Sequence, residues 1–299
     1  MRKVLLALAL GVSVSGMAQL LNVGSIEKVN IPENKANKVA AISPDGSYLL
    51  VTTDYNKGLT KYDLATGQTT VVTDAAGAGY DAKISSDGQT VVYREKSTDK
   101  KHLQRALLAS KNMATGERKE LVKSTRNLQG FTVEGKTAIA VNNGKMSKKA
   151  LSSEKAQVSA PVLSIDKLQL MITENGKTRV FSPLGTQYRY IWPSVSPDGQ
   201  KALFFVSGKG AYVCNIDGTG LQELGTVRAP KWFNNNIIVG MNDKDNGEVY
   251  TSSEIVAVDL QGNRQVLTDD SVIAMYPLPA AEKIAFSTPT GEAYIINLK

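Results

Sequence analysis

Short runs of apolar residues alternate with polar positions along the chain, and tight turns separate the runs. The clearest stretch extends from Ser196 to Gly220 and reads as turn, apolar run, turn, apolar run, turn. Proline fixes φ and glycine accepts positive φ, so clusters such as Pro-Asp-Gly favour tight turns. The β-branched and aromatic runs between the turns favour strands. The pattern therefore predicts a succession of antiparallel strands.

This unit recurs along the chain. The corresponding turn positions are Asp45, Asp87, Glu134, Asp198, Asn235 and Glu282. The steps between them are 42, 47, 64, 37 and 47 residues. Apart from the longest step, the spacing matches the roughly 40 to 50 residues of a four-stranded propeller blade. We therefore predict an all-β fold, a six-bladed β-propeller of four-stranded antiparallel blades.

The two ends of the chain and its longest step complete this prediction. Residues 24–31 alternate like a single strand without a sequence neighbour, and the last unit is one strand short. We expect this N-terminal strand to lie beside residues 293–297 and to complete the last blade, because closing the ring removes an open edge. Residues 142–160 are polar and rich in Lys and Ser, so we predict an inserted loop there.

The first 18 residues have the features of a signal peptide. Arg2 and Lys3 precede an apolar run over residues 4–14, and small residues follow at 16–18. We expect a mature domain over residues 19–299, exported to the periplasm or the extracellular space. No later apolar run approaches the about 20 residues of a transmembrane helix, so we do not expect the protein to span a membrane. We also expect the propeller to be monomeric.

Positive charge is concentrated in one part of the chain. The formal net charge is +7, and residues 94–155 contain 15 Lys and Arg against 6 Asp and Glu. Such a section could attract an acidic partner. Solvated charges on loops and edge strands, which discourage aggregation, are the alternative explanation. The export signal argues against nucleic acid as a partner.

Residues that would indicate catalysis are scarce. His102 and Cys214 are the only residues of their types, and no Gly-x-Ser-x-Gly motif occurs, so neither a serine-hydrolase elbow nor a histidine zinc site is expected. We predict that His102 is exposed at a hairpin tip and that Cys214 is buried. Residues 242–248 offer the best calcium loop, but Lys244 stands where a carboxylate is needed. The sequence thus predicts no catalytic residue and no cofactor.

The Ser-Pro-Asp-Gly turn, its apolar strand and the following hairpin ending in Asp-Gly or Thr-Gly resemble the repeat of TolB-like, WD-repeat-like propellers. That repeat is also related to the propeller domains of prolyl-oligopeptidase-type enzymes. Residues 43–73 and 196–224 match closely, 85–122 match moderately, and the remaining repeats match only in spacing. TolB has an additional N-terminal α/β domain, whereas about 20 residues precede the first blade here. The resemblance implies the fold and leaves the function open.

In a propeller, the segments that enter the innermost strands surround one mouth of the central channel. Here they are rich in aromatic and basic residues, which are favoured in binding hot spots. The predicted channel mouth comprises Tyr80, Asp81, Tyr188, Arg189, Tyr190, Trp192, Arg228, Lys231, Trp232 and Tyr276. For the two tryptophans, packing between blades is the alternative role.

The sequence favours an exported, non-enzymatic propeller that binds a protein, a peptide or a cell-envelope component through this mouth. The alternative is a divalent-cation-dependent small-ligand binder or hydrolase. In that case Asp81 and other inward groups would hold an ion such as Ca²⁺ in the channel, because hard cations take oxygen ligands.

Overall fold

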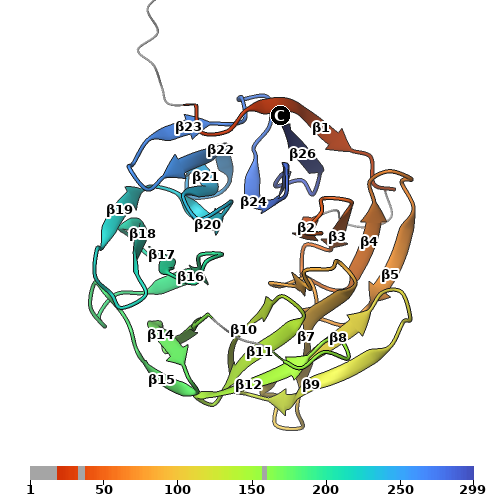
Figure 1. Cartoon of the computed structure of the whole chain (residues 1–299). Coiled ribbons are helices and arrows are strands. Elements are labelled where there is room, and N and C mark those ends of the chain that lie inside the picture. Colours follow the sequence, from red (N-terminus) through yellow and green to blue (C-terminus); the bar gives the residue numbers. More distant parts are fainter. Residues whose placement is uncertain (1–18, 33–37, 157–159) are drawn as a thin grey trace, which may run out of the picture.

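The computed structural model describes residues 19–32, 38–156 and 160–299. The predicted signal peptide, residues 1–18, lies outside the described residues. Figure 1 shows small sheets arranged radially around a central opening, which confirms the β-propeller. No helix among the described residues is long and apolar enough to cross a bilayer.

The described residues form seven sheets, which we number as blades I to VII in chain order. Blade I consists of β2 (Lys38–Ile42), β3 (Tyr48–Thr52), β4 (Leu59–Asp63) and β5 (Thr69–Thr73). Blade II consists of β6 (Lys83–Ile84), β7 (Thr90–Thr98), β8 (Gln104–Asn112) and β9 (Arg118–Thr125). Two three-stranded blades follow. Blade III consists of β10 (Leu128–Glu134), β11 (Thr137–Asn142) and β12 (Lys145–Ala150), and blade IV of β13 (Val162–Asp166), β14 (Gln169–Glu174) and β15 (Lys177–Val180).

The remaining three blades are four-stranded. Blade V consists of β16 (Tyr190–Val195), β17 (Lys201–Val206), β18 (Gly210–Asn215) and β19 (Gln222–Gly225). Blade VI consists of β20 (Arg228–Trp232), β21 (Ile237–Asp245), β22 (Tyr250–Asp259) and β23 (Arg264–Val266). Blade VII consists of β24 (Met275–Ala280), β25 (Lys283–Ser287), β26 (Ala293–Leu298) and the N-terminal β1 (Val23–Val29).

The N-terminal strand closes the ring as predicted. β1 pairs antiparallel with β26, with Ile26 opposite Ile296, and Figure 1 shows the two strands side by side. The side-chain amide of Gln265 extends the closure to blade VI: its Oε1 accepts from Leu20 N at 2.7 Å and Leu21 N at 2.8 Å. Leu21 is buried in the core between the last two blades.

The recurring aspartates are turn residues, as their sequence context indicates. Asp45 Oδ1 accepts from Ser47 N at 3.1 Å, and Asp87 and Asp198 accept at 3.0 Å from the amides two residues on. The hydroxyl of the serine two residues earlier (Ser43, Ser85 or Ser196) and then these amides hydrogen-bond to the ionised form and lower the pKa of each carboxyl. The second strand of each blade then crosses the core; in β17 five of the six residues are buried.

The prediction of six blades is wrong, and the error lies within the longest step. Residues 128–180 form two three-stranded blades in place of one degenerate blade with an inserted loop. β12 lies within the segment that we expected to be a loop. Because β12 is rich in lysine and lies at the rim, it lacks the apolar run that identifies inner strands elsewhere.

The two short blades are adjacent for a geometric reason. β13 runs opposite to β10: a Cβ at Gly130 would lie 3.1 Å from Ser164 Cβ, while Ala160 N donates to Glu134 at 3.4 Å. In a blade with an odd number of antiparallel strands, the last strand ends on the face opposite to the one where the first strand began. A second such blade restores the direction, so that β16 again runs in the same sense as β10.

Candidate functional site

Apart from β13, which runs in the opposite direction, the innermost strands start on one face of the ring, which we call the mouth face; the Asp-Gly turns lie on the opposite turn face. Asp81, Trp192, Ala229 and Tyr276 occupy corresponding places near these starts, with φ between 47° and 59°. Three of the four coincide with register shifts in β16, β20 and β24. Left-handed backbone is strained for residues other than glycine, and bulges redirect side chains near sites. The repeated bulge marks the mouth face as the candidate site.

A charged cluster, which we call the axial cluster, consists of Asp81, Lys83, Arg94 and Lys231. Asp81 Oδ1 and Lys83 Nζ are 2.6 Å apart, with side chains 35% and 31% exposed. Lys231 comes from blade VI, across the ring from blade II, yet it interacts electrostatically with both Lys83 and Asp81. The charges of opposite blades are therefore electrostatically coupled across the channel.

The axial cluster shifts the acid–base properties of its members. Burial raises the pKa of Asp81, but Lys83, Lys231 and Arg94 outweigh burial and hold this pKa below its usual range. For Lys231, burial and the like charge of Lys83 lower the pKa to about 8, and Asp81 only partly opposes them. Three cations share one carboxylate, so the cluster carries surplus positive charge.

Arg94 on β7 links the axial cluster to the aromatic residues of the mouth. Its guanidinium carbon lies 5.6 Å from the ring centre of Tyr80 and 5.2 Å from that of Phe131. Such stacking holds a guanidinium by cation–π attraction. Its Nε is buried without a hydrogen-bond partner in the part of the chain that the structure describes. A buried donor without a partner is rare, which points to a water or ligand there.

A second charged pair lies at the mouth face between blades VI and VII. Arg228 Nη1 donates to Asp243 Oδ2 at 2.5 Å; the Asp243 side chain is fully buried and that of Arg228 is 34% exposed. Burial and the neighbouring Tyr250 raise the pKa of Tyr276, while Lys38 Nζ lies 5.1 Å from its ring centre. A buried carboxylate thus orients an arginine that remains partly open to solvent.

The structure places the ten predicted mouth residues in different roles. Tyr80 is half exposed and Tyr188 lies under Lys209, 4.8 Å from its ring centre, while Arg189 is exposed. Tyr190 is fully buried, and its hydroxyl bonds to Leu184 N and Gly185 O, so it supports the fold and is not open to a ligand. Asp81, Lys231, Arg228 and Tyr276 belong to the two charged groups described above.

Both tryptophans pack between blades. Trp192 meets Phe205 edge to face at 5.4 Å and contacts the cores on both sides of blade VI. Trp232 packs against the core between blades V and VI, and its Nε1 lacks a partner among the described residues. The packing role therefore accounts for most of the Trp192 surface.

Sequence reasoning missed four residues of the site: Lys38, Lys83, Arg94 and Asp243. Lys83 lies only two positions after the predicted Asp81, so an alternation of inward side chains could have indicated it. Arg94 and Asp243 lie on second strands. No local pattern distinguishes them from other strand charges, and only the twist of the blades brings them to the mouth.

Other sequence predictions concern single residues away from the mouth. His102 is exposed at the tip of the β7–β8 hairpin, as expected, and burial raises the pKa of the Cys214 thiol to about 12, which makes it unreactive. Residues 246–249 form the tip of the β21–β22 hairpin, as expected. Among the described residues, no group of three or more His, Cys, Asp or Glu side chains could hold a metal ion.

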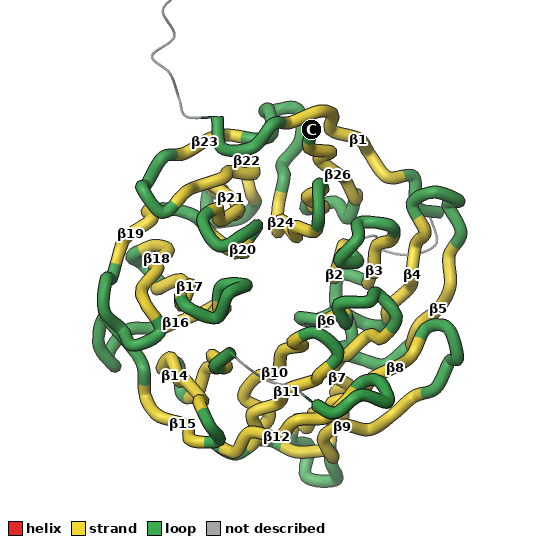
Figure 2. Tube along the Cα trace, in the orientation of Figure 1, coloured by secondary structure: helices red, strands yellow, loops and turns green. Residues whose placement is uncertain are grey.

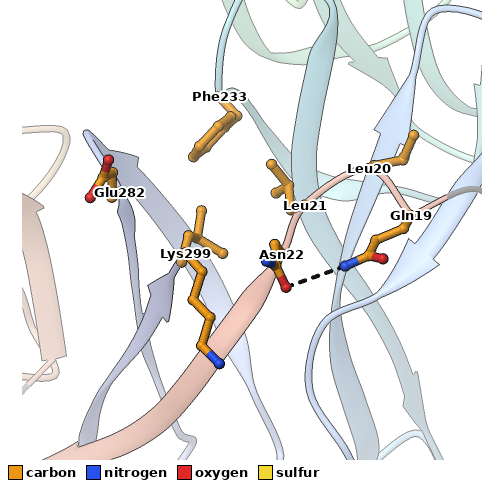
Figure 3. A pocket seen from close by; sticks show the side chains of 8 residues that line it. Gln19, Leu20, Leu21, Asn22, Phe233, Glu282 and Lys299 are labelled. Carbon is orange, nitrogen blue, oxygen red and sulfur yellow. Dashed lines mark hydrogen bonds between the residues drawn. The ribbon is translucent and has the colours of Figure 1, made fainter.

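A pocket of about 400 Å³ lies away from the mouth, where the chain closes the ring (Figure 3). The N-terminal segment 19–22 lines it together with Phe233, Glu282, Leu298 and Lys299. Figure 3 shows the Gln19 amide turned towards Asn22, to which it donates at 3.3 Å. The walls of the pocket are partly apolar and partly charged. Because the N-terminal segment and the last two blades line it, the pocket lies at the seam, the place where the two ends of the chain close the ring.

No family model and no curated protein matches this chain. Solved propellers do match. Oligogalacturonate lyase in complex with manganese has 15% identity and a TM-score of 0.48, covering 86% of this chain and 76% of the lyase chain. The β-propeller domain of the Trilobed protease from Pyrococcus furiosus has 14% identity and a TM-score of 0.59, covering 89% and 97%. A chain of the mitotic checkpoint complex has 9% identity and a TM-score of 0.57, covering 99% and 98%.

These comparisons correct one conclusion from the sequence. We expected a non-enzymatic scaffold because no catalytic motif is present. The propeller domain of a protease matches this chain, so the conclusion drawn from the missing motif is wrong and the fold leaves catalysis open. At these identities the likeness establishes the fold alone and transfers neither the lyase activity nor its manganese. What the comparisons establish is that this chain has the β-propeller fold.

Proposed function

We propose that the protein binds a small anionic molecule at the axial cluster and that Lys231 can exchange a proton with it. One observation carries this proposal: the charges of Lys83 and Lys231, on opposite sides of the ring, repel each other, and Asp81, which pairs with Lys83, is the one carboxylate of the axial cluster. Repulsion between like charges costs free energy in the folded state. A bound carboxylate or phosphate would relieve it and would also accept a hydrogen bond from the free Nε of Arg94.

The lowered pKa of Lys231 allows its amine to accept or donate a proton near neutral pH. A lysine is normally protonated at neutral pH, and a pKa of about 8 leaves a useful fraction of free amine. General bases work best when their pKa is close to the operating pH. The reaction class that fits is therefore proton transfer on an anionic substrate, with Lys83 and Arg94 holding the anionic group.

A divalent cation does not fit the axial cluster. Asp81 is its only carboxylate, and one of its oxygens is already bonded to the Lys83 ammonium. Three neighbouring cations repel an added cation, and hard cations need several oxygen ligands. We therefore retain the small-ligand part of the alternative drawn from the sequence and derive no step through a metal.

Anion binding can be tested with citrate as a probe. We expect calorimetric titration at pH 7 to show saturable binding of one citrate per chain, weakened about tenfold by Lys83→Met or Lys231→Met, as for loss of one charged contact. Lys244→Met is the matched control, because Lys244 is exposed on a hairpin of the mouth face. Equal affinity in all four proteins, or no binding to the wild type, would contradict the proposal.

The pKa of Lys231 predicts a pH-dependent stability. Its folded-state pKa of about 8 lies below the usual 10.5, so the folded state binds fewer protons than the unfolded state between these values. The charged Lys231 side chain therefore lowers the free energy of unfolding by its full amount at pH 7, and this effect disappears as the pH rises towards 10.5. We expect Lys231→Met to stabilise the protein at pH 7 by about 1–2 kcal/mol, with the gain vanishing by about pH 10.5. Urea unfolding of both proteins across this range provides the measurement; a gain that does not change with pH would contradict it.

A further inference from the structure

As far as the structure describes the chain, blades III and IV have three strands each, whereas the other five blades have four. β12 and β15 are therefore the outermost strands of two adjacent blades, and Figure 2 shows them next to each other along the rim. Within the described residues, β12 forms ladder bonds only to β11, and β15 only to β14. The backbone N–H and C=O groups of β12 that point away from β11 therefore have no strand partner among the described residues. In neighbouring blade II, the fourth strand β9 occupies the equivalent position.

The described residues that follow β12 do not pair with its outer edge. After β12 it turns onto the turn face, where Leu151 N donates to Lys136 O at 2.8 Å and Glu154 pairs with Lys136 at 3.4 Å. Ala160 then contacts Glu134 and Gly199, both also at the turn face. The described parts of the connection between blades III and IV therefore lie at the ends of the strands and not along the edge of β12.

The uncovered edge is strongly basic. Lys145, Lys148 and Lys149 on β12 are exposed, and none is ion-paired in the part of the chain described. Glu154, the acid nearest in sequence, pairs with Lys136, and Glu174 in the adjacent blade IV pairs with Arg179. Edge lysines oppose pairing with a second copy of the same strand, since like charges would meet. The same charges attract an acidic segment.

We propose that the outer edge of β12 accepts an extended acidic segment of a partner protein as the fourth strand of blade III. Strand addition obtains affinity from main-chain hydrogen bonds and selectivity from side chains. The lysines of β12 supply that selectivity, and the absent strand leaves room for the segment at the rim. The site lies on the rim and away from the axis, so its test is independent of anion binding at the axial cluster.

The probe is a fluorescent peptide of four Glu-Val repeats, which favours an extended conformation and carries alternating negative charge. We expect saturable binding by fluorescence anisotropy that weakens with salt, and slower hydrogen exchange at the amides of β12. The same peptide N-methylated at every second residue keeps its charge but cannot complete the ladder, so it should not bind. Equal binding of both peptides would reduce the contact to unspecific charge attraction and overturn the proposal.

Charge reversal locates the site. Lys145→Glu/Lys149→Glu should weaken peptide binding about tenfold, as expected for charges that flank a polar interface. The control is Lys119→Glu/Lys123→Glu on β9, which changes two exposed lysines at the same spacing on the outer strand of a complete blade. Equal loss in both double variants, protection of β9 instead of β12, or formation of a dimer of the chain would each contradict the assignment.

Discussion

Replacing Arg228 with methionine should lower the free energy of unfolding by about 3–5 kcal/mol, the usual effect of breaking a buried ion pair. Asp243 would then remain fully buried without the one ion-pair partner that it has among the described residues, and its Oδ1 already lacks a hydrogen bond there. A carboxylate that stays buried without a counter-charge costs far more free energy than the small change in packing when methionine replaces arginine. Urea unfolding at pH 7 gives the measurement.

Two further variants separate the charge from the packing. Arg228→Met/Asp243→Leu removes both charges and should recover most of the loss, since an apolar pair can replace a buried ion pair. Arg179→Met breaks an exposed pair, with Glu174 3.4 Å away, and should change stability by less than about 1 kcal/mol. A loss below about 1 kcal/mol in Arg228→Met would show that the pair is hydrated and does not orient the arginine at the mouth.

A protein that begins at residue 30 should fail to close the ring stably. β26 would lose its outer neighbour, and the core between the last blades would lose Leu21, which alone contributes about 1.5–3 kcal/mol when fully buried. With the ladder bonds of β1, we expect a total loss of about 5 kcal/mol or more. The truncated protein should aggregate at the open edge. Thermal unfolding and size-exclusion chromatography measure these effects.

Restoring the strand from outside provides the control for this truncation. A synthetic peptide of residues 19–31 should raise the melting temperature of the truncated protein in a concentration-dependent way, because it binds only the folded state. A version with Leu21→Ser should restore less, since Leu21 supplies the buried apolar contact. A truncated protein that melts at the temperature of the full chain would show that the seam contributes nothing to closure.

The candidate site illustrates how far local sequence patterns reach. Asp81, Arg228, Lys231 and Tyr276 were predicted at the mouth because segments entering the innermost strands are recognisable from the turns that follow them. Tyr190 was included on the same basis, although it points into the core and bonds to Leu184 and Gly185. A strand alternates its side chains between two faces, and one bulged residue changes which face a side chain occupies.

The sequence by itself determined the β-propeller, the turn aspartates and closure by the N-terminal strand, since repeated turns and apolar runs are local signals and the incomplete last repeat requires a partner. Only the tertiary structure decided the number of blades. β12 and β15 carry little apolar pattern because they lie at the rim, and two odd-stranded blades compensate each other in direction. The electrostatic coupling of Lys83 and Lys231 also required the closed ring, because 148 residues separate them along the chain and only the circular arrangement places blades II and VI around a common axis.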